Sequence, residues 1–347
     1  MRFLIDIHHP KHVHFFRPFV RRWLERGDAV QIVTRDKDIT HDLLDLYELP
    51  YVCLSRQQTG ARSAVELARR WLQMGIWIRR FQPDVVLSVA GISTAPPARL
   101  LRVPNVAFTD TETAVLSNRI AIPFADRIVT PEWFTAAHGP RHFRYRGFHE
   151  WSYLNPTVFR ADPQVVRDAG IDPDRPYAVV RLVRWRAAHD RAQHGFDAAD
   201  AIDVVQRLSR RLPVHLSVEG PVSDALRPYV TRMRVDRIHH VLAHASLVVG
   251  ESPSMATEAA LLGIPAVLVS SWAGRCGNMQ VLERRYGLMQ VFNDSRRGVE
   301  AAVALAESPA DRGVAEQRRQ ALLTDLCDMD AMMDEQVAAV ARGGSET

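Results

Sequence analysis

The sequence is poor in the features that mark several large classes of protein. Its three cysteines lie far apart and form no CxxC pair, so neither a disulfide framework nor a zinc site is indicated. No run approaches the roughly 18 uninterrupted apolar residues that a membrane-spanning helix needs. Charged residues and histidines interrupt the only apolar stretch near the N-terminus, which argues against a signal peptide. We therefore expect a cytoplasmic protein with reduced thiols.

Motifs for common cofactors are missing as well. There is no G-x-G-x-x-G loop followed by an acidic residue about 20 positions later, which argues against a nicotinamide enzyme. The D-x-D triplets at 36–38 and 172–174 are expected by chance in this composition, and neither lies at a convincing ligand-binding position. Nucleic-acid recognition motifs are also absent. The expectation is a protein without a bound cofactor, a metal or a nucleic-acid partner.

The chain is nevertheless long enough for two hydrophobic cores. Its 347 residues suit two domains of about 150 residues each. Residues 1–150 carry 21 Lys and Arg against 15 Asp and Glu, so the positive charge is concentrated in the first half. Charge alone does not choose between a phosphorylated substrate, an anionic membrane surface and nucleic acid as the partner of that half.

Short apolar runs alternate with amphipathic stretches in both halves of the chain. The predicted strands are Phe3–Ile7, Ala29–Thr34, Tyr51–Leu54, Val85–Val89 and Val106–Thr109, followed by Tyr177–Val183, Val214–Val218, Leu247–Gly250, Ala266–Ser270 and Met289–Phe292. Helices in the second half are expected to begin near Asp197, Asp236, Pro253 and Asn278, and residues 298–342 to be helical. Repeated strand–helix units predict an α/β fold with parallel sheets covered on both faces.

The alternation breaks down between Gly139 and Pro176, where aromatic residues and prolines replace the periodic pattern. We interpret this segment as an inter-domain connection. The prediction is a basic Rossmann-like domain at 1–155, a second Rossmann-like domain at 156–330, and a helix end with a frayed tail at 331–347. Two doubly wound domains facing a central cleft would bind ligands at the carboxyl ends of their strands.

The most informative segment runs from Gly250 to Glu258 and is followed by AALLGIPAVLV. A strand ends at Gly250, the hydroxyl residues Ser252 and Ser254 form a turn, and a helix starts at once. Backbone N–H groups at such a helix start make an anion site suited to a diphosphate. Glu258 falls about two turns later, where its carboxylate can accept hydrogen bonds from a ribose diol. An ordinary N-capped helix with a solvated glutamate is the alternative.

This segment resembles a known donor-nucleotide motif. The pattern S-x-S-x-x-x-E-A-A-x-x-G-x-P is similar to that of lipid A disaccharide synthase, of the glucosaminyltransferase that makes lipid II, and of the UDP-GlcNAc 2-epimerases, which are enzymes of GT-B type. The resemblance implies that Glu258 holds the ribose and that the backbone near Ile238 meets the uracil. It places Ser252, Ser254 and Met255 in the same nucleotide site.

A second resemblance extends over nearly the whole chain. HPKHVHFFRP, TDTETA, PFADRIVTPEWF, YRGFHEWSYL, RWRAAHD, SVEGP and RIHHVL together look like the uncharacterised family called domain of unknown function 354. That family has no settled reaction, so this resemblance by itself names no chemistry.

Four histidines lie around the expected start of the first helix, in HHPKHVH at 8–14. The resemblance sets His12 against a histidine that follows a glycine-rich loop in related glycosyltransferases. The glycines are absent here, which argues against a phosphate cradle at this loop. An imidazole in a cleft is a natural general base near pH 7, so His12 and His14 are the candidate bases, with a surface or capping role as the alternative. No H-E-x-x-H spacing supports zinc.

Glu112 lies beyond the predicted strand Val106–Thr109, in Asp110-Thr111-Glu112. The resemblance to the epimerases implies that Glu112 takes part in proton transfer or binds an acceptor hydroxyl. Asp110 is equally suited to cap the next helix.

Further candidates follow strands of the second half. Arg181 and Arg184 suit bidentate contact with a pyrophosphate, and surface ion pairing is the alternative for each. The resemblance places donor-sugar contacts at Glu219, Asn278 and Gln280.

The predicted helix at 63–81 combines a core-facing stripe with a basic face. The stripe consists of apolar residues at helical spacing, namely Leu67, Trp71, Met74, Ile78 and Phe81. Leu72, Ile76 and Trp77 fall outside it, among the arginine pairs at 69–70 and 79–80. Packing against a neighbouring helix is the commoner explanation for such residues, and peripheral contact with anionic lipid at the inner membrane face is the alternative.

These patterns predict a metal-independent, nucleotide-sugar-dependent glycosyltransferase in glycan or glycolipid biosynthesis. A UDP-linked sugar, bound by the domain at 156–330, is the favoured co-substrate. The acceptor, on the side of the domain at 1–155, is unidentified, and a lipid-linked acceptor is one alternative. A UDP-sugar 2-epimerase or a hydrolysing enzyme is the first alternative. A non-catalytic sugar-nucleotide-binding protein is the second, and the missing glycine loop supports it.

Overall fold

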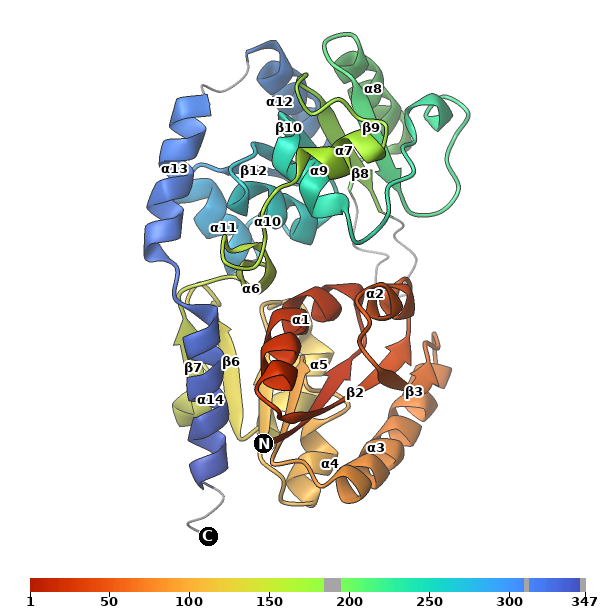
Figure 1. Ribbon diagram of the computed structural model, residues 1–347. Coiled ribbons are helices and arrows are strands. Elements are labelled where there is room, and N and C mark those ends of the chain that lie inside the picture. Colours follow the sequence, from red (N-terminus) through yellow and green to blue (C-terminus); the bar gives the residue numbers. More distant parts are fainter. Residues whose placement is uncertain (184–194, 309–311, 344–347) are drawn as a thin grey trace. The chain divides into compact units, whose positions relative to one another are not determined.

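Both ends of the chain belong to the same folded unit. The computed structural model describes residues 1–183, 195–308 and 312–343, which fall into two units (Figure 1). Unit 1 consists of Met1–Tyr153 together with Leu326–Thr347, and unit 2 of Leu154–Asp325. The sequence pattern predicted the division at 155–156 and a helix end with a frayed tail at 331–347. In the structure a helix that begins at Met329 lies in the part of unit 1 that follows Asp325.

Unit 1 is built on a seven-stranded parallel sheet in the order β3-β2-β1-β4-β5-β6-β7. Its strands are β1 (Arg2–Ile7), β2 (Ala29–Asp36), β3 (Tyr51–Arg56), β4 (Val85–Val89), β5 (Asn105–Phe108), β6 (Arg127–Pro131) and β7 (His142–Tyr145). Its helices are α1 (Pro10–Glu25), α2 (Thr40–Leu46), α3 (Arg62–Phe81), α4 (Ala95–Leu100), α5 (Val115–Ala121), the 3-10 turns η1 (Ile122–Phe124) and η2 (Gly139–Arg141), and α14 (Met329–Gly343), while α6 (Trp151–Leu154) lies at the boundary with unit 2.

Unit 2 repeats the same principle with five parallel strands in the order β12-β11-β10-β8-β9. The strands are β8 (Ala178–Leu182), β9 (Val214–Val218), β10 (Leu247–Gly250), β11 (Ala266–Val269) and β12 (Met289–Phe292). The helices are α7 (Pro163–Asp168), α8 (Ala198–Ser209), η4 (Arg227–Tyr229), α9 (Ile238–His244), α10 (Pro253–Leu261), α11 (Gly277–Arg284), α12 (Ser295–Glu307) and α13 (Arg312–Asp325).

Alternate residues of β1 pack on opposite faces of the unit 1 sheet. Phe3 stacks on Trp23 of α1, with ring centroids 4.1 Å apart. Leu4 belongs to a buried cluster with Met74 and Ile78 of α3. A strand that is buried on both faces is mostly apolar on both, which explains the run Phe3-Leu4-Ile5 in β1.

The order of strands reverses once in each sheet. The reversal lies between β1 and β4 in unit 1 and between β8 and β10 in unit 2. Loops at the carboxyl ends of the strands diverge at such a point, and open α/β sheets bind their ligands there.

The sequence pattern missed two strands, β6 and β7. The inter-domain connection predicted at 139–176 is wrong over its first part, because His142–Tyr145 pairs with β6 in the unit 1 sheet. All ten predicted strands are present, with bounds that differ by two residues or fewer at each end.

Helix α14 follows α13 and packs on unit 1 (Figure 1). It lies against β4, β5 and β6, and it buries Met332, Met333 and Val337. The two terminal guanidinium nitrogens of Arg22 on α1 donate to the carboxylate of Asp334, at 2.8 and 2.9 Å. None of the described helices is both long and apolar enough to span a bilayer.

Helix α3 buries Met74 and Ile78 as its spacing predicts. Trp77 packs against the core cluster of unit 1, as expected. Leu72 and Ile76 are 71% and 61% exposed, so the expected packing does not occur in unit 1 for these two residues. Arg70 does not belong to the predicted basic face, because it is 3% exposed and pairs with a buried carboxylate.

Candidate functional site

The N-terminus of α10 lies directly beyond β10 in unit 2. A Cβ atom on Gly250 would lie 2.4 Å from the carbonyl oxygen of Arg181, so glycine is needed where β8 and β10 approach each other. Ser252 caps α10, and its hydroxyl accepts a long hydrogen bond of 3.4 Å from the Met255 N–H. The first N–H groups of a helix have no partners within it, so this helix start is suited to an anion.

Glu251 ties the two sides of the reversal point together. Its buried carboxylate accepts hydrogen bonds of 2.7 Å from the N–H of Val183 and of 2.7 Å from the N–H of Phe196. These two residues flank 184–194, and the predicted site residue Arg184 lies there, outside the described residues. Gly195 is needed beside the carboxylate, because a Cβ there would lie 2.2 Å from Oε1 of Glu251. Glu251 was not singled out from the sequence, although it lies in the segment Gly250–Glu258, directly before the quoted motif.

Glu258 is buried on α10, 7% exposed, and is not the solvated glutamate of the alternative explanation. One of its carboxylate oxygens lies 3.2 Å from Nε2 of His239 on α9. Ile238 is the first residue of α9, so the two nucleotide-site candidates belong to neighbouring helices. Ser254 precedes Glu258 by four residues and therefore shares its face of α10.

Arg181 is engaged within unit 2. Its guanidinium donates to the Ser217 hydroxyl at 2.8 Å and pairs with the Glu219 carboxylate. The two predicted donor-site residues Arg181 and Glu219 thus contact each other. Asn278 and Gln280 both lie on α11, which packs against α10, and the Gln280 amide donates to the Gly274 carbonyl at 2.9 Å.

In unit 1, Lys11 binds two carboxylates that follow different strands. Its ammonium lies 2.5 Å from Asp110, after β5, and 2.7 Å from Glu150, after β7. Burial would raise the pKa of Asp110, but His149, which is protonated at the acid pH where Asp110 titrates, and the Lys11 ammonium outweigh it and hold that pKa below its ordinary range. Burial and the charge of Asp110 raise the pKa of Glu150 to about 7 in spite of Lys11. Below about pH 7, a cation, a carboxylate and a carboxylic acid therefore lie together.

His149 completes this cluster. Its Nδ1 lies 3.3 Å from the Asp110 carboxylate, and its ring packs against Phe15 with centroids 4.6 Å apart. Burial lowers the pKa of His149 to about 4, so the imidazole is neutral near pH 7. Asp110 does not cap the next helix, because α5 begins at Val115 with Ala114 as its N-cap. The capping alternative is therefore wrong.

The predicted bases His12 and His14 are both buried on α1. His12 meets His8 edge to face at 4.4 Å, and its Nδ1 has no hydrogen-bond partner among the described residues. Burial and the neighbouring imidazoles of His8 and His9 hold the pKa of His12 well below 6.5. Nδ1 of His14 lies 3.3 Å from the Tyr47 hydroxyl. Glu112 accepts a hydrogen bond of 3.3 Å from the Thr135 N–H, so its carboxylate lies near the end of β6.

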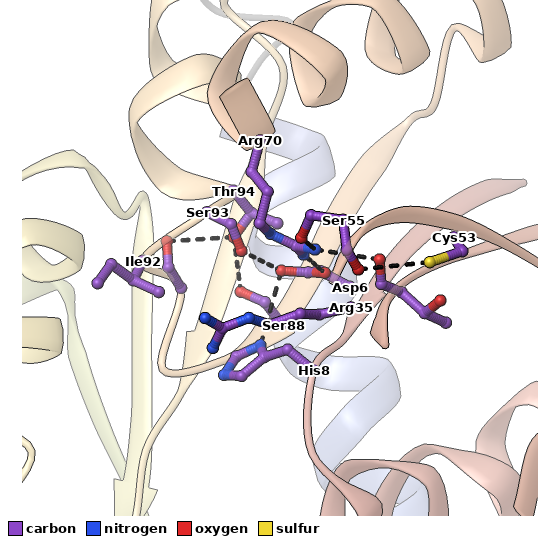
Figure 2. Close-up of polar contacts among 12 residues, drawn as sticks. Asp6, His8, Arg35, Cys53, Ser55, Arg70, Ser88, Ile92, Ser93 and Thr94 are labelled. Atoms are coloured by element: carbon purple, nitrogen blue, oxygen red, sulfur yellow. Dashed lines mark hydrogen bonds and ion pairs between the residues drawn. The ribbon is translucent and has the colours of Figure 1, made fainter. Parts of the chain in front are cut away.

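A second cluster of buried polar side chains lies at β1, next to the reversal point of the unit 1 sheet (Figure 2). Asp6 on β1 is fully buried, and its carboxylate binds Arg70 of α3 at 2.5 Å and the Ser93 hydroxyl. Ser93 follows Ala90 and Gly91, which both have positive φ, of 67° and 61°. A non-glycine residue in this region is strained, and such strain clusters at functional sites. The one signal in the sequence was a charged residue inside the apolar run of β1.

Within the described ranges, no group of three or more His, Cys, Asp or Glu side chains is placed to hold a metal ion. The clusters above are joined by hydrogen bonds and ion pairs instead.

The chain matches a known family over most of its length. A family model described as "Protein of unknown function (DUF354)" matches residues 1–341. An uncharacterized protein of Methanocaldococcus jannaschii is 22% identical over 279 residues, 76% of this chain and 80% of that protein. A UDP-N-acetylglucosamine–N-acetylmuramyl-(pentapeptide) pyrophosphoryl-undecaprenol N-acetylglucosamine transferase of Symbiobacterium thermophilum is 24% identical over 308 residues, 82% of this chain and 79% of that protein.

Solved structures of two kinds of enzyme share the fold. A UDP-GlcNAc 2-epimerase from Neisseria meningitidis, bound to UDP-GlcNAc, has a TM-score of 0.68 at 8% identity and covers 100% of both chains. The glycosyltransferase VinC in complex with dTDP has a TM-score of 0.63 at 13% identity, covering 99% of this chain and 100% of that one. At such identities the likeness shows the fold alone. It confirms the predicted α/β architecture of GT-B type.

Proposed function

The chain belongs to the family described as DUF354, and we propose that it is a nucleotide-sugar-dependent glycosyltransferase of GT-B type. In this proposal unit 2 binds the donor, for which a UDP-sugar is the favoured candidate, and unit 1 binds the acceptor. The reaction needs no metal ion. The relatives support an enzyme acting on a nucleotide-linked sugar, since they include a GlcNAc transferase and a UDP-GlcNAc 2-epimerase.

The start of α10 carries the proposal. It combines a Ser252-capped helix N-terminus with Glu258 on the same face as Ser254. The rise from Ser254 to Glu258 is about 6 Å along the axis, comparable to the span between a diphosphate and the ribose hydroxyls of one nucleotide. The N-terminal amides would bind the diphosphate and Glu258 the ribose diol.

The other predicted donor residues are assigned to the same ligand. The backbone near Ile238 contacts the uracil of the nucleotide. Asn278 and Gln280 on α11 contact the donor sugar. Arg181 stabilises the departing diphosphate once its contact with Glu219 is exchanged for the phosphate, because guanidinium binds phosphate in bidentate fashion. Met255 lies at the same helix start.

The proposed reaction is a direct displacement. An acceptor hydroxyl oxygen forms a bond to the anomeric carbon as the bond from that carbon to the diphosphate breaks. An imidazole of the 8–14 segment, His12 or His14 in the sequence-based assignment, takes the hydroxyl proton, and the nucleoside diphosphate leaves with the bonding electrons. Glu112 binds an acceptor hydroxyl.

A UDP-sugar 2-epimerase is the second candidate. The likeness to the epimerase from Neisseria meningitidis favours it, together with Lys11, Asp110 and Glu150 at the carboxyl ends of the unit 1 strands. Incubation of UDP-GlcNAc without an acceptor separates the two: an epimer or free sugar supports epimerisation or hydrolysis, and unchanged UDP-GlcNAc supports transfer.

Unit 1 is also proposed to dock on an anionic membrane surface, as a lipid-linked acceptor would require. α3 exposes Leu72 and Ile76 one turn apart, and Arg69, Arg79 and Arg80 are exposed along the same helix. A basic helix with exposed apolar side chains on one face binds at the lipid headgroup boundary.

Calorimetric titration of UDP tests the donor site. Replacing Glu258 by Ala should weaken UDP binding about 10- to 150-fold, the loss of roughly 1.5 to 3 kcal/mol expected for hydrogen bonds to a charged group. Glu258→Gln keeps one acceptor oxygen and should fall between wild type and Ala. Glu307→Ala, on the exposed surface of α12, is the control and should leave the affinity unchanged. Undiminished UDP affinity in Glu258→Ala would contradict the assignment, and absence of UDP binding by the wild type would overturn the proposed donor.

A further inference from the structure

His8 lies at the reversal point of the unit 1 sheet, directly after β1. Its side chain is 18% exposed, whereas His12 and His14 are buried. An imidazole that exchanges a proton with a ligand must have one ring nitrogen open to it. By this measure His8 is better placed than the two histidines to which the sequence pointed.

The carboxylate of Asp6 faces the Nδ1 side of the His8 ring (Figure 2). Nδ1 of His8 lies 3.7 Å from Oδ2 of Asp6. The other oxygen of Asp6 binds Arg70, which is itself fixed by hydrogen bonds to the Thr34 carbonyl, at 3.0 Å, and to the Ser55 hydroxyl, at 3.1 Å. The carboxylate therefore has a fixed position.

The charge on Asp6 is stable at neutral pH. Burial alone would raise the pKa of Asp6, but the Arg70 charge and the contacts with His8 and Ser93 outweigh it and hold the pKa below its ordinary range. A fixed negative charge beside Nδ1 favours the tautomer with the proton on that nitrogen. The lone pair then belongs to Nε2.

We infer that Asp6 and His8 form a carboxylate–imidazole pair in which Asp6 holds the proton on Nδ1 and Nε2 of His8 accepts the proton of the acceptor hydroxyl. This rests on the proposed glycosyl transfer. The hydroxyl proton passes to Nε2 while the oxygen bonds to the anomeric carbon, and the diphosphate departs with the electron pair of the broken bond. Asp6 then faces an imidazolium, whose positive charge strengthens the contact. Catalytic hydrogen bonds are often long without substrate and tighten in the complex.

The groups around His8 leave it uncharged before the reaction. Asp6 on β1 and the ring of His12 on α1 contact it, and the charges of Arg70 on α3 and Lys37 after β2 act on it. Burial lowers the pKa of His8 from 6.5, Asp6 opposes that change, and Arg70 and Lys37 add to it. A neutral imidazole is the form that accepts a proton.

A comparison with His41 shows what is particular to His8. Nδ1 of His41 also lies near a carboxylate, at 3.8 Å from Asp36, but its Nε2 is hydrogen-bonded to the Thr34 hydroxyl at 2.9 Å. Nε2 of His41 is therefore already engaged in a hydrogen bond within the protein. His149 also contacts a carboxylate, but it is fully buried.

The tautomer of His8 tests the pair without any turnover. In long-range proton–nitrogen spectra of the ¹⁵N-histidine-labelled full chain, assigned by loss of a signal in His8→Gln, we expect protonated Nδ1 and unprotonated Nε2 at pH 7.5. Asp6→Asn should remove that preference. A proton on Nε2 in the wild type, or an unchanged tautomer in folded Asp6→Asn, would overturn the inference. If Asp6→Asn does not fold, the wild-type tautomer still decides.

Turnover tests the proton transfer itself. The probe is release of UDP from UDP-GlcNAc with a panel of acceptors. His8→Gln should lower turnover by about 100- to 10,000-fold with UDP affinity retained, and His138→Gln, elsewhere in unit 1, should not. In Asp6→Asn the acid limb of the pH–rate profile should move to lower pH, because the charge that favours imidazolium is gone.

Wild-type turnover in His8→Gln overturns the assignment of the base. Failure of the wild type to bind UDP would instead overturn the proposed function, and the tautomer would still decide the pair.

Discussion

Lys11 carries one positive charge between two carboxylates, and this decides which of them holds a proton. A single ammonium cannot neutralise Asp110 and Glu150 together, and both are buried. Asp110 has His149 as a further neighbour and stays ionised. Glu150 faces the charge of Asp110 and keeps its proton up to a pH of about 7, its pKa in the folded chain. Two carboxyl groups of unlike protonation in one site are typical of acid–base chemistry.

The stability of the protein should therefore fall between pH 5 and pH 8 in a way that depends on Glu150. In the unfolded chain this carboxyl group has its ordinary pKa of 4.5, and in the folded chain the pKa is about 7. Between these values the folded state binds more protons, so the free energy of unfolding decreases as pH rises. Over this range the wild type should lose about 1 to 3 kcal/mol more than Glu150→Gln, measured by urea unfolding. Glu25→Gln, exposed on α1, should follow the wild type, and parallel pH curves for Glu150→Gln and the wild type would contradict the assignment.

The residues of these clusters could be named from the sequence only where a motif contained them. Lys11 and Asp110 lie in quoted motifs, but their ion pair joins positions 99 apart, and Asp6 with Arg70 joins positions 64 apart. Contacts of that separation leave no periodic signal in one sequence. Arg70 illustrates the result: its neighbour Arg69 is exposed, and spacing alone placed both on one basic face.

At the scale of elements, the strands were predicted where burial makes them apolar. β1, β4 and β10 are mostly apolar, interrupted by Asp6 in β1 and Ser88 in β4, because both faces of a parallel sheet are covered. β7 is an edge strand with sequence HFRY, and only Tyr145 in it is buried. An edge strand with polar side chains has no such run, and for that reason the segment was mistaken for a connection.

Helix α3 makes the membrane proposal testable. The protein should sediment with vesicles of phosphatidylglycerol and not with phosphatidylcholine, and binding should weaken as salt rises. Replacing Leu72 and Ile76 together by Glu removes apolar area and adds two negative charges, so binding should fall at least about tenfold.

The control for this experiment is Val314→Glu on α13. Val314 is 40% exposed and belongs to unit 2, outside the basic residues 1–150 of the sequence. The Val314→Glu variant adds one negative charge to a different helix and should bind the vesicles as the wild type does. Equal binding by all three proteins, or no binding by the wild type, would contradict docking through α3.

At the scale of the whole molecule, the return of the chain to unit 1 was not predictable. The helical character of 298–342 was expected from its composition, but nothing in the pattern says which sheet α14 covers. The answer lies in packing: the helix buries Met332, Met333 and Val337 in unit 1, and Arg127 donates to the buried Gln336 side chain at 2.7 Å. Unit 1 is therefore completed only by the last residues of the chain, whereas all of unit 2 precedes them.

This order of assembly predicts a defect confined to one unit. Met333 is fully buried on α14, and Met→Ala at such a site costs about 2 to 5 kcal/mol. In Met333→Ala, amide hydrogen exchange measured on peptide fragments should be at least about tenfold faster in β4, β5 and β6. The protected amides of these strands exchange when the unit that α14 stabilises opens. Exchange in β10 and β11 and the affinity for UDP should stay as in the wild type. Glu335→Ala, exposed on the same helix, should change neither. Equal acceleration in the strands of both units would show instead that the two open together, and that α14 stabilises the chain as a whole.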